Sequence, residues 1–160
     1  MEKRIFESPI GLLYLTVENS HVIKISYDDK VQNESGTAEE NRVMNELVTE
    51  LTDYFSGKLQ RFQVNFKLSG TAFEQAVYEV LTEIPYGDFW SYKQVASHIQ
   101  NASSVRAVGQ ANRKNPLPII IPCHRVVQEG GQLGGYNGAD YAKKIWLLEF
   151  EMNHKTDFWS

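Results

Sequence analysis

The chain has 160 residues, of which 42% are hydrophobic and 22% charged, and its formal net charge at pH 7 is −4. This composition excludes a disordered tail and is typical of a globular protein with one domain or two small ones. No apolar run reaches the roughly 18 residues that a membrane-spanning helix needs, and the first residues lack the apolar segment of a signal peptide. We therefore expect no membrane association and a cytoplasmic location. The single cysteine, Cys123, excludes an internal disulfide and any zinc site built on several cysteines.

The first part of the chain has the pattern of a small sheet with a helix. Residues 3–28 contain short alternating apolar runs separated by turn sequences, which predict antiparallel strands. In residues 40–55 apolar side chains recur every four positions, which predicts a helix that Gly57 ends. Residues 62–66 alternate again and predict one more strand. We expect residues 1–69 to form an N-terminal α+β support domain.

Residues 70–160 are predicted to form a second, mainly helical domain. A capping box, in which Ser or Thr is followed three residues later by Glu or Gln, begins a helix at Thr71 and another at Ser91. The helix after Ser91 is separated from a helical segment at 105–114 by a tight turn at 100–102. Two short helices joined in this way predict a helix-turn-helix.

The second helix of this motif combines basic and polar side chains with small residues, which would let its backbone approach a DNA groove. Residues 87–138 hold 5 basic and 2 acidic side chains, a balance of +3, whereas residues 1–86 hold 8 and 14, a balance of −6. Positive charge is therefore concentrated around the cysteine, which is compatible with a DNA-binding face. From these residues alone, a surface helix that is basic at one end is an equal alternative.

Cys123 lies in the stretch 115–127, where three prolines and a buried apolar run would hold it in one place. A free cysteine has a pKa of about 8.5, and His124 and Arg125 are candidates for raising its thiolate fraction. Adjacent residues of an extended chain point to opposite sides, so we expect a water molecule between Cys123 and His124. A lone cysteine is more often an inert core residue. The residues alone leave open a cysteine hydrolase and an alkyl acceptor.

The sequence Ile-Pro-Cys-His-Arg-Val-Val at 121–127 resembles the active-site motif of the O6-alkylguanine-DNA alkyltransferases, also called methylated-DNA–protein-cysteine methyltransferases. The resemblance covers residues 70–152 and is looser in the N-terminal part. The matching segments, in the order and spacing of the family, are Ile84-Pro85-Tyr86-Gly87, Ser91-Tyr92, Arg106-Ala107-Val108-Gly109, Asn115-Pro116, Gly135-Tyr136 and Lys144…Trp146-Leu147-Leu148…Glu151.

The resemblance implies direct reversal of DNA damage by this chain. Cys123 would take the alkyl group from O6-alkylguanine, and from O4-methylthymine, in an irreversible single-turnover reaction. His124 would act as its base through a water, with Glu151 holding the far side of the imidazole. Asn115 would brace the turn that presents the cysteine, and Tyr92 would donate a proton or hydrogen bond to the leaving guanine. Without the family, Glu151 would be read as a solvated glutamate and Tyr92 as a core aromatic residue.

The same resemblance implies a pocket for a flipped base and a DNA-binding surface. The carbonyls of Cys123 and Val126 would accept from the exocyclic amine of the base. Three further positions would line the pocket: Tyr136, Asn137 and Gly138. Arg106 would fill the gap that the flipped nucleotide leaves, although it could equally be a phosphate contact. The remaining DNA-binding positions are Ala107, Gly109, Gln110, Arg113, Lys114 and Arg125. Gln110 and Arg113 stand where bacterial relatives often have small residues, so the DNA footprint of this chain is expected to differ.

We expect no cofactor, because the sequence contains no cofactor motif, and no metal, because the N-terminal part has no cysteine and one histidine, His21. The expected partner is double-stranded DNA that contains alkylated bases, bound by a monomer. Two hypotheses compete with this interpretation. A non-catalytic helix-turn-helix protein would bind DNA without alkyl transfer. A hydrolase built on Cys123, His124 and Glu151 would turn over repeatedly.

Overall fold

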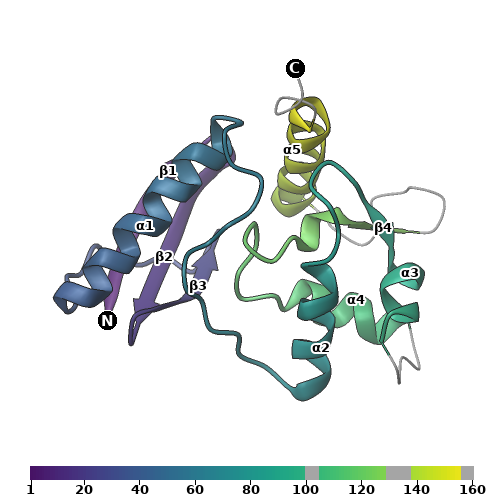
Figure 1. Ribbon diagram of the computed structural model, residues 1–160, viewed down its shortest axis with the longest axis horizontal. Helices are drawn as coiled ribbons and strands as arrows, with labels where there is room; N and C mark the ends of the chain where they lie inside the picture. Colours follow the sequence, from purple (N-terminus) through teal and green to yellow (C-terminus); the bar gives the residue numbers. More distant parts are fainter. Residues whose placement is uncertain (100–104, 129–137, 156–160) are drawn as a thin grey trace. The chain divides into compact units, whose positions relative to one another are not determined.

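The computed structural model describes residues 1–99, 105–128 and 138–155, with the side chains of 138–140 excepted. The chain divides into two compact units, Met1–Ser69 and Gly70–Ser160. Figure 1 shows the first in purple to blue and the second in teal to yellow. Within the described residues, no helix has the length and apolarity needed to cross a membrane.

The first unit is an antiparallel sheet covered by one helix, as the sequence predicts. Its strands are β1 (Glu2–Ser8), β2 (Gly11–Glu18) and β3 (His21–Ser26), in the order β1-β2-β3. The helix α1 (Ala38–Phe55) lies along the sheet (Figure 1). Alternate residues of β2 and one face of α1 supply the core. The fully buried side chains include Leu13, Leu15, Val17, Val43, Leu47 and Leu51. The predicted periods of two and four residues are therefore those of the buried faces.

The predicted strand at residues 62–66 is wrong in extent. Only an isolated parallel bridge forms there, in which Val22 N donates to Asn65 O at 2.9 Å and Lys67 N donates to Val22 O at 3.0 Å. The carboxylate of Glu50, on α1, accepts hydrogen bonds from the backbone N–H groups of Gln63 and Val64. These donors are satisfied by a side chain, so they have no need of a strand partner.

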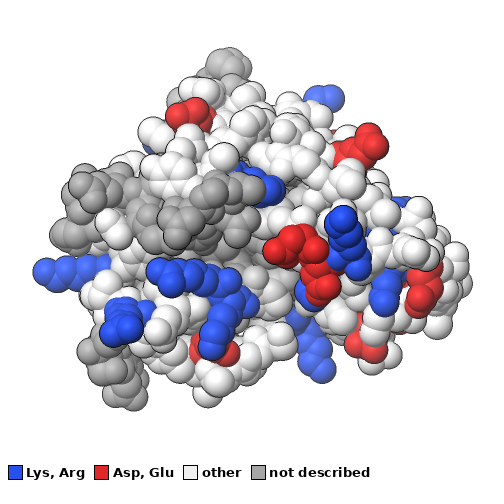
Figure 2. All heavy atoms as spheres, turned by 180° about the vertical axis from the view of Figure 1, so that it is seen from behind, with Lys and Arg blue, Asp and Glu red and all other residues white. Residues whose placement is uncertain are grey.

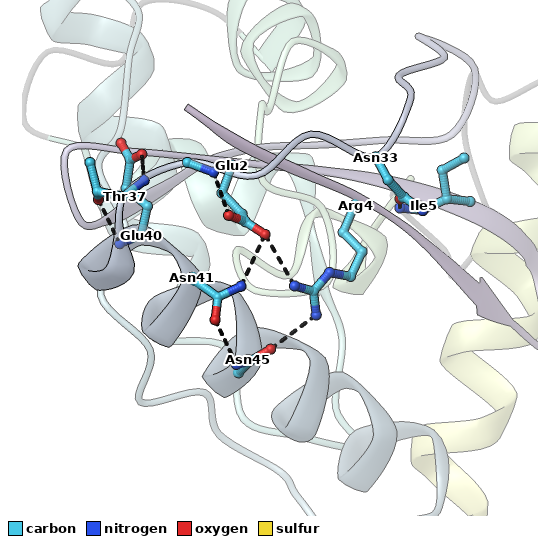
Figure 3. A network of polar contacts seen from close by, with 9 residues as sticks. Glu2, Arg4, Ile5, Asn33, Thr37, Glu40, Asn41 and Asn45 are labelled. Atoms are coloured by element: carbon cyan, nitrogen blue, oxygen red, sulfur yellow. Dashed lines mark hydrogen bonds and ion pairs between the residues drawn. The ribbon is translucent and has the colours of Figure 1, made fainter.

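A polar network joins β1 to α1 (Figure 3). Glu2, only 3% exposed, accepts hydrogen bonds from the backbone N–H of Gly36 at 2.7 Å, from Asn41 Nδ2 at 3.2 Å and from Arg4 Nη2 at 3.1 Å. Arg4 Nη1 also donates to Asn45 Oδ1 at 3.0 Å. The Gly36 bond, with the Asn41 and Arg4 contacts, outweighs burial and lowers the pKa of Glu2 below its ordinary value. Glu2 is thus an ionised carboxylate enclosed by donors.

The second unit is mainly helical and carries one short parallel strand pair. Its elements are α2 (Ala72–Leu81), β4 (Trp90–Ser91), α3 (Tyr92–Ser97), α4 (Val105–Arg113), the 3-10 helix η1 (Cys123–Arg125), β5 (Val126–Val127) and α5 (Gly138–His154). Both predicted capping boxes are present, at Thr71 and at Ser91. The helices α2, α3 and α4 pack against one another, and β4 pairs with β5. The α+β class with a helical second part is confirmed, while the predicted turn at 100–102 lies outside the described residues.

Candidate active site

A braced turn precedes the cysteine. Asn115 Nδ2 donates to Ile121 O at 2.8 Å, and Asn115 Oδ1 accepts from Leu117 N at 3.0 Å, so one side chain ties both ends of the turn together. Ile121 N also donates to Leu117 O at 2.9 Å. Within the turn Ile119 has a φ of 78°, although it is β-branched. This conformation is strained for such a residue and persists because the surrounding contacts determine the backbone. The turn therefore presents the following residues in one fixed direction.

Cys123 begins a 3-10 helix, so the expected extended backbone at this position is wrong. Cys123 N donates to Ile121 O at 2.7 Å, Arg125 N donates to Pro122 O at 3.0 Å, and Val126 N donates to Cys123 O. With three residues per turn, Cys123 and His124 point about 120° apart. The side chain of Cys123 is 9% exposed. The thiol thus lies in a largely apolar wall, with its neighbour directed elsewhere.

His124, Arg125 and Glu151 form a buried polar cluster between η1 and α5. His124 Nε2 lies 2.7 Å from Glu151 Oε2, and Arg125 donates through Nε to Oε1 at 2.7 Å and through Nη2 to Oε2 at 3.0 Å. Arg125 Nη1 donates to Ile84 O at 2.8 Å. The cluster joins residues 26 and 27 positions apart in sequence. The fold therefore brings together the histidine and the glutamate for which the resemblance implies linked roles.

The electrostatics of the cluster fix the form of the imidazole. Burial alone would raise the pKa of Glu151, but the hydrogen bond from His124 and the charge and hydrogen bonds of Arg125 outweigh it and hold that pKa below its ordinary value. Burial lowers the pKa of His124, more than Glu151 raises it. A neutral imidazole beside a carboxylate carries its hydrogen on Nε2. Its buried Nδ1 has no hydrogen-bond partner in the described part of the chain, so its lone pair is available to a proton.

The resemblance places Arg125 on the DNA-binding surface, and the structure corrects this. Its side chain is 8% exposed and is held by Glu151, by the carbonyl of Ile84 and by the ring of Tyr86, whose centroid is 5.5 Å from the guanidinium carbon. All three of its side-chain nitrogens donate to acceptors within the protein, so the side chain is not positioned to contact a phosphate. The positive charge of Arg125 is therefore paired with the carboxylate of Glu151.

Lys144 was part of the matched pattern, but its role was missed. It is 2% exposed, donates from Nζ to the Val126 carbonyl, and lies 5.6 Å from the centroid of the Tyr92 ring. Burial lowers its pKa to about 8. Burial and the charge of Cys123 raise the pKa of Tyr92, which keeps its hydroxyl protonated at neutral pH. The sequence signal was the spacing of Lys144 and Glu151 with two leucines, which puts both charged side chains on the buried stripe of one helix.

The helix α4 separates its side chains by exposure. The exposed positions are Val105, Arg106, Gln110 and Arg113, followed by Lys114, while Ala107 and Gly109 are half-buried. Its hidden positions are Val108, Ala111 and Asn112. In Figure 2 several lysine and arginine side chains lie near one another at the left of the view, with few acidic side chains between them. The cationic side chains expected to contact DNA are therefore available to solvent.

The carbonyls expected to bind the base already have protein donors. Cys123 O accepts from Val126 N and from Asn112 Nδ2, the latter at 3.3 Å. Val126 O accepts from Lys144 Nζ, and its residue also pairs with Trp90 of β4. Tyr136 and Asn137 lie outside the described residues, as does the side-chain environment of Gly138, the first residue of α5. No group of three histidine, cysteine or carboxylate side chains in the described residues is placed to hold a metal ion.

A cysteine beside a buried histidine–carboxylate pair, on a unit with an exposed basic helix, defines the class as DNA-binding proteins with a cysteine nucleophile. Comparison with known families agrees. Residues 72–153 match the 6-O-methylguanine DNA methyltransferase DNA binding domain, and residues 1–68 match the ribonuclease-like domain of the same family. The chain belongs to the 6-O-methylguanine DNA methyltransferase family.

Individual relatives extend over nearly the whole chain. A methylated-DNA–protein-cysteine methyltransferase of Mycobacterium leprae is 41% identical over 150 residues, which are 92% of this chain and 90% of the relative. The constitutive protein of that name from Bacillus subtilis is 35% identical, over 91% of this chain and 92% of its own. The crystal structure of Mycobacterium tuberculosis OGT in complex with DNA is similar with a TM-score of 0.84 and 36% identity, covering 96% of this chain and 94% of that one.

Proposed function

We propose that Cys123 accepts the alkyl group from O6-alkylguanine in DNA, so that the chain repairs this lesion by direct reversal. One observation carries the proposal. The imidazole of His124 is held by Glu151 at Nε2 and has its buried Nδ1 without a hydrogen-bond partner among the described residues, next in sequence to a cysteine on a rigid turn. An oriented base beside a nucleophile is the arrangement that activates a thiol.

The reaction is a displacement at the alkyl carbon. The sulfur of Cys123 forms a bond to that carbon while the bond from carbon to guanine O6 breaks. The thiol proton passes through a water to Nδ1 of His124, and the imidazolium is stabilised by the ionised Glu151. The leaving guanine accepts a hydrogen bond or a proton from the hydroxyl of Tyr92. The proton that the thiol gave to His124 passes on through solvent to the base, directly or by way of Tyr92, so that the base gains one proton and both residues end neutral.

The substrate has to leave the base stack before this step. A 9% exposed thiol cannot reach a base inside a duplex, so the alkylated nucleotide flips out. The outer face of α4 docks on double-stranded DNA, with Arg106 in the gap of the stack and Arg113 and Lys114 near phosphates. The carbonyl of Val126 accepts from the exocyclic amine of the guanine. The relative from Mycobacterium tuberculosis was crystallised in complex with DNA, which supports DNA as the partner.

The protein is consumed by its reaction. The product is a thioether, and the sequence offers neither a second cysteine nor a cofactor motif to remove the alkyl group. Each monomer therefore acts once, on O6-alkylguanine and also on O4-methylthymine. This separates the proposal from a hydrolase, which would release product repeatedly.

The test is incubation with duplex DNA that contains a single O6-methylguanine, followed by mass spectrometry of the intact protein and its peptides. The expected result is one methyl group per molecule, on the peptide with Cys123, and none in Cys123→Ala or with unmodified DNA. DNA binding without any gain in mass would support the non-catalytic alternative. More than one equivalent of repaired DNA per protein would support a catalyst with turnover.

A further inference from the structure

The side chain of Asn112 joins the helix α4 to two groups of the reaction site. It is 1% exposed, and its Nδ2 donates to the Cys123 carbonyl at 3.3 Å. It also makes a side-chain hydrogen bond with Tyr92. A single amide thus contacts the main chain of Cys123 and the side chain of Tyr92, the tyrosine proposed to donate to the leaving base.

Because Asn112 lies on α4, this contact connects the reaction site to the helix proposed to dock on DNA. Side chains of α4 face different ways: Gln110 and Arg113 are exposed, whereas Ala111 and Asn112 are buried. An α-helix advances 100° per residue, so one rigid element carries the surface proposed for DNA on one face and the amide on the other. Any displacement of α4 on docking is transmitted to the Asn112 side chain, because the peptide bonds between them do not stretch.

The contact involves the carbonyl of Cys123 and not its sulfur. Asn112 reaches the Cys123 carbonyl, which already accepts from Val126 N, so both lone pairs of this oxygen are used. This fixes the rotation of the peptide after Cys123 and thereby the direction of its Cα–Cβ bond. At the same time the bond to Tyr92 holds the ring whose hydroxyl is proposed to donate to the leaving base.

We propose that Asn112 is a positioning residue, which sets the alignment of the Cys123 sulfur and the Tyr92 hydroxyl across the alkylated base and couples that alignment to the DNA-docking helix. This rests on the proposed function and deepens it. Asn112 touches neither DNA nor the alkyl group. Its loss should therefore slow the chemical step and leave DNA binding unchanged.

The test compares Asn112→Ala and Asn112→Asp with the wild-type chain and with Asn153→Ala, an exposed asparagine on α5 that serves as the matched control. The aspartate has the same shape but, when ionised, no donor for the Cys123 carbonyl. Single-turnover rates with methylated duplex are measured over a range of DNA concentrations. The endpoint number of methyl groups per molecule, the affinity for unmodified duplex and the thermal unfolding midpoint are measured on the same samples.

We expect both Asn112 variants to show a maximal rate reduced about tenfold or more, since a small misalignment of reacting atoms has effects of this order. The endpoint should still reach one methyl group per molecule, the DNA affinity should stay within about twofold, and Asn153→Ala should match the wild type on all measures. The free base O6-methylguanine should lose less rate than the methylated duplex does, because it reacts without docking on α4 and so loses the alignment but not the coupling.

Three results would overturn the inference. A lowered endpoint with an unchanged rate for the surviving molecules would mean that Asn112 only stabilises the fold. Weaker binding to unmodified duplex with an unchanged maximal rate would mean that it acts through the DNA surface. Equal rates for the wild type and Asn112→Asp would show that the hydrogen bond from Asn112 Nδ2 to the Cys123 carbonyl is not needed for alignment. If the wild-type chain takes up no methyl group, the proposed function itself fails, which is a separate outcome.

Discussion

Each unit of the molecule contains a buried carboxylate beside an arginine, and the two clusters serve different ends. Glu2 in the first unit is 3% exposed and Glu151 in the second is 0% exposed. Both have a pKa held below the ordinary value, in spite of burial, by hydrogen-bond donors. Burial and a shifted pKa therefore do not identify a functional carboxylate.

The two clusters differ in the further contacts of the groups that donate to each carboxylate. The donors to Glu2 are the backbone of Gly36, Asn41 and Arg4, none of which leads to a nucleophile. One donor to Glu151 is His124, whose second ring nitrogen has no hydrogen-bond partner in the described residues. The first cluster is closed and holds β1 to α1. The second is open at one atom, His124 Nδ1, which is the atom proposed to take the thiol proton.

Removing the charge of Glu151 should have the largest effect. In Glu151→Gln the imidazole loses the acceptor that fixes its tautomer, and Arg125 becomes a buried charge without its counterion. We expect the alkylation rate to fall about 100-fold or more, the range of a lost general base, and the free energy of unfolding to fall by about 3 kcal/mol. Alkylation reactions stopped at successive times give the rate, and urea unfolding gives the free energy of unfolding. A rate within a few fold of the wild type would show that His124 needs no carboxylate.

Changing the arginine but not its charge sharpens the comparison. Arg125→Lys keeps a cation near Glu151 and loses the fork that contacts both of its oxygens and the Ile84 carbonyl. We expect a rate about tenfold lower and a DNA affinity equal to that of the wild type, because Arg125 is buried. Binding to unmodified duplex at two salt concentrations is the check. A weaker affinity with a reduced salt dependence would show that Arg125 contacts DNA phosphates.

The closed cluster should respond in stability alone. In Glu2→Gln one acceptor oxygen becomes a donor, which faces Gly36 N, Asn41 or Arg4 without a match. We expect the free energy of unfolding to fall by roughly 1–3 kcal/mol and the alkylation rate per folded molecule to stay unchanged. Urea unfolding and the endpoint-corrected rate give both numbers. A slower rate in the folded protein would contradict the division into closed and open clusters.

Acid should weaken both clusters, with a smaller effect than the substitutions near neutral pH. A carboxyl whose pKa is lower in the folded state stabilises the fold above its unfolded pKa, about 4.5, and this contribution is lost as the pH falls towards the folded pKa. We expect the free energy of unfolding to decline below about pH 5, and the slope to be shallower in Glu2→Gln and in Glu151→Gln. Urea unfolding in steps from neutral pH to pH 3 measures the slopes. An unchanged slope in both variants would place the acid sensitivity elsewhere.

The sequence was most informative where the signal is local. Periodicity and capping boxes identify the sheet, α1 and the starts of α2 and α3, because each depends on residues within one element. The strand at 62–66 could not be judged in the same way, since Glu50 binds its backbone from another element. The extended backbone at Cys123 was wrong for a similar reason: the turn held by Asn115 leads into a 3-10 helix.

The candidate site shows the same limit more clearly. Motif resemblance linked His124 to Glu151 across 27 positions, which no local pattern could do. The DNA-binding role predicted for Arg125 needs an exposed side chain, and arginine is seldom buried; its distant partner Glu151 is what makes burial tolerable. Asn112 lies in the segment 105–114, for which the sequence predicts a helix with polar and small side chains. The pattern of Val108, Ala111 and Asn112 on one stripe would have indicated its burial.

The frame around Cys123 is built on peptide groups. Asn115 holds the carbonyl of Ile121 and Asn112 holds the carbonyl of Cys123, so neither bond involves the sulfur. An alanine at position 123 would leave this frame intact and remove only the reactive atom. Such a chain would find the damaged base, hold it outside the helix and never release itself by reacting. The architecture that makes a repair reagent thus also makes a probe, with which the lesion can be captured and counted in DNA.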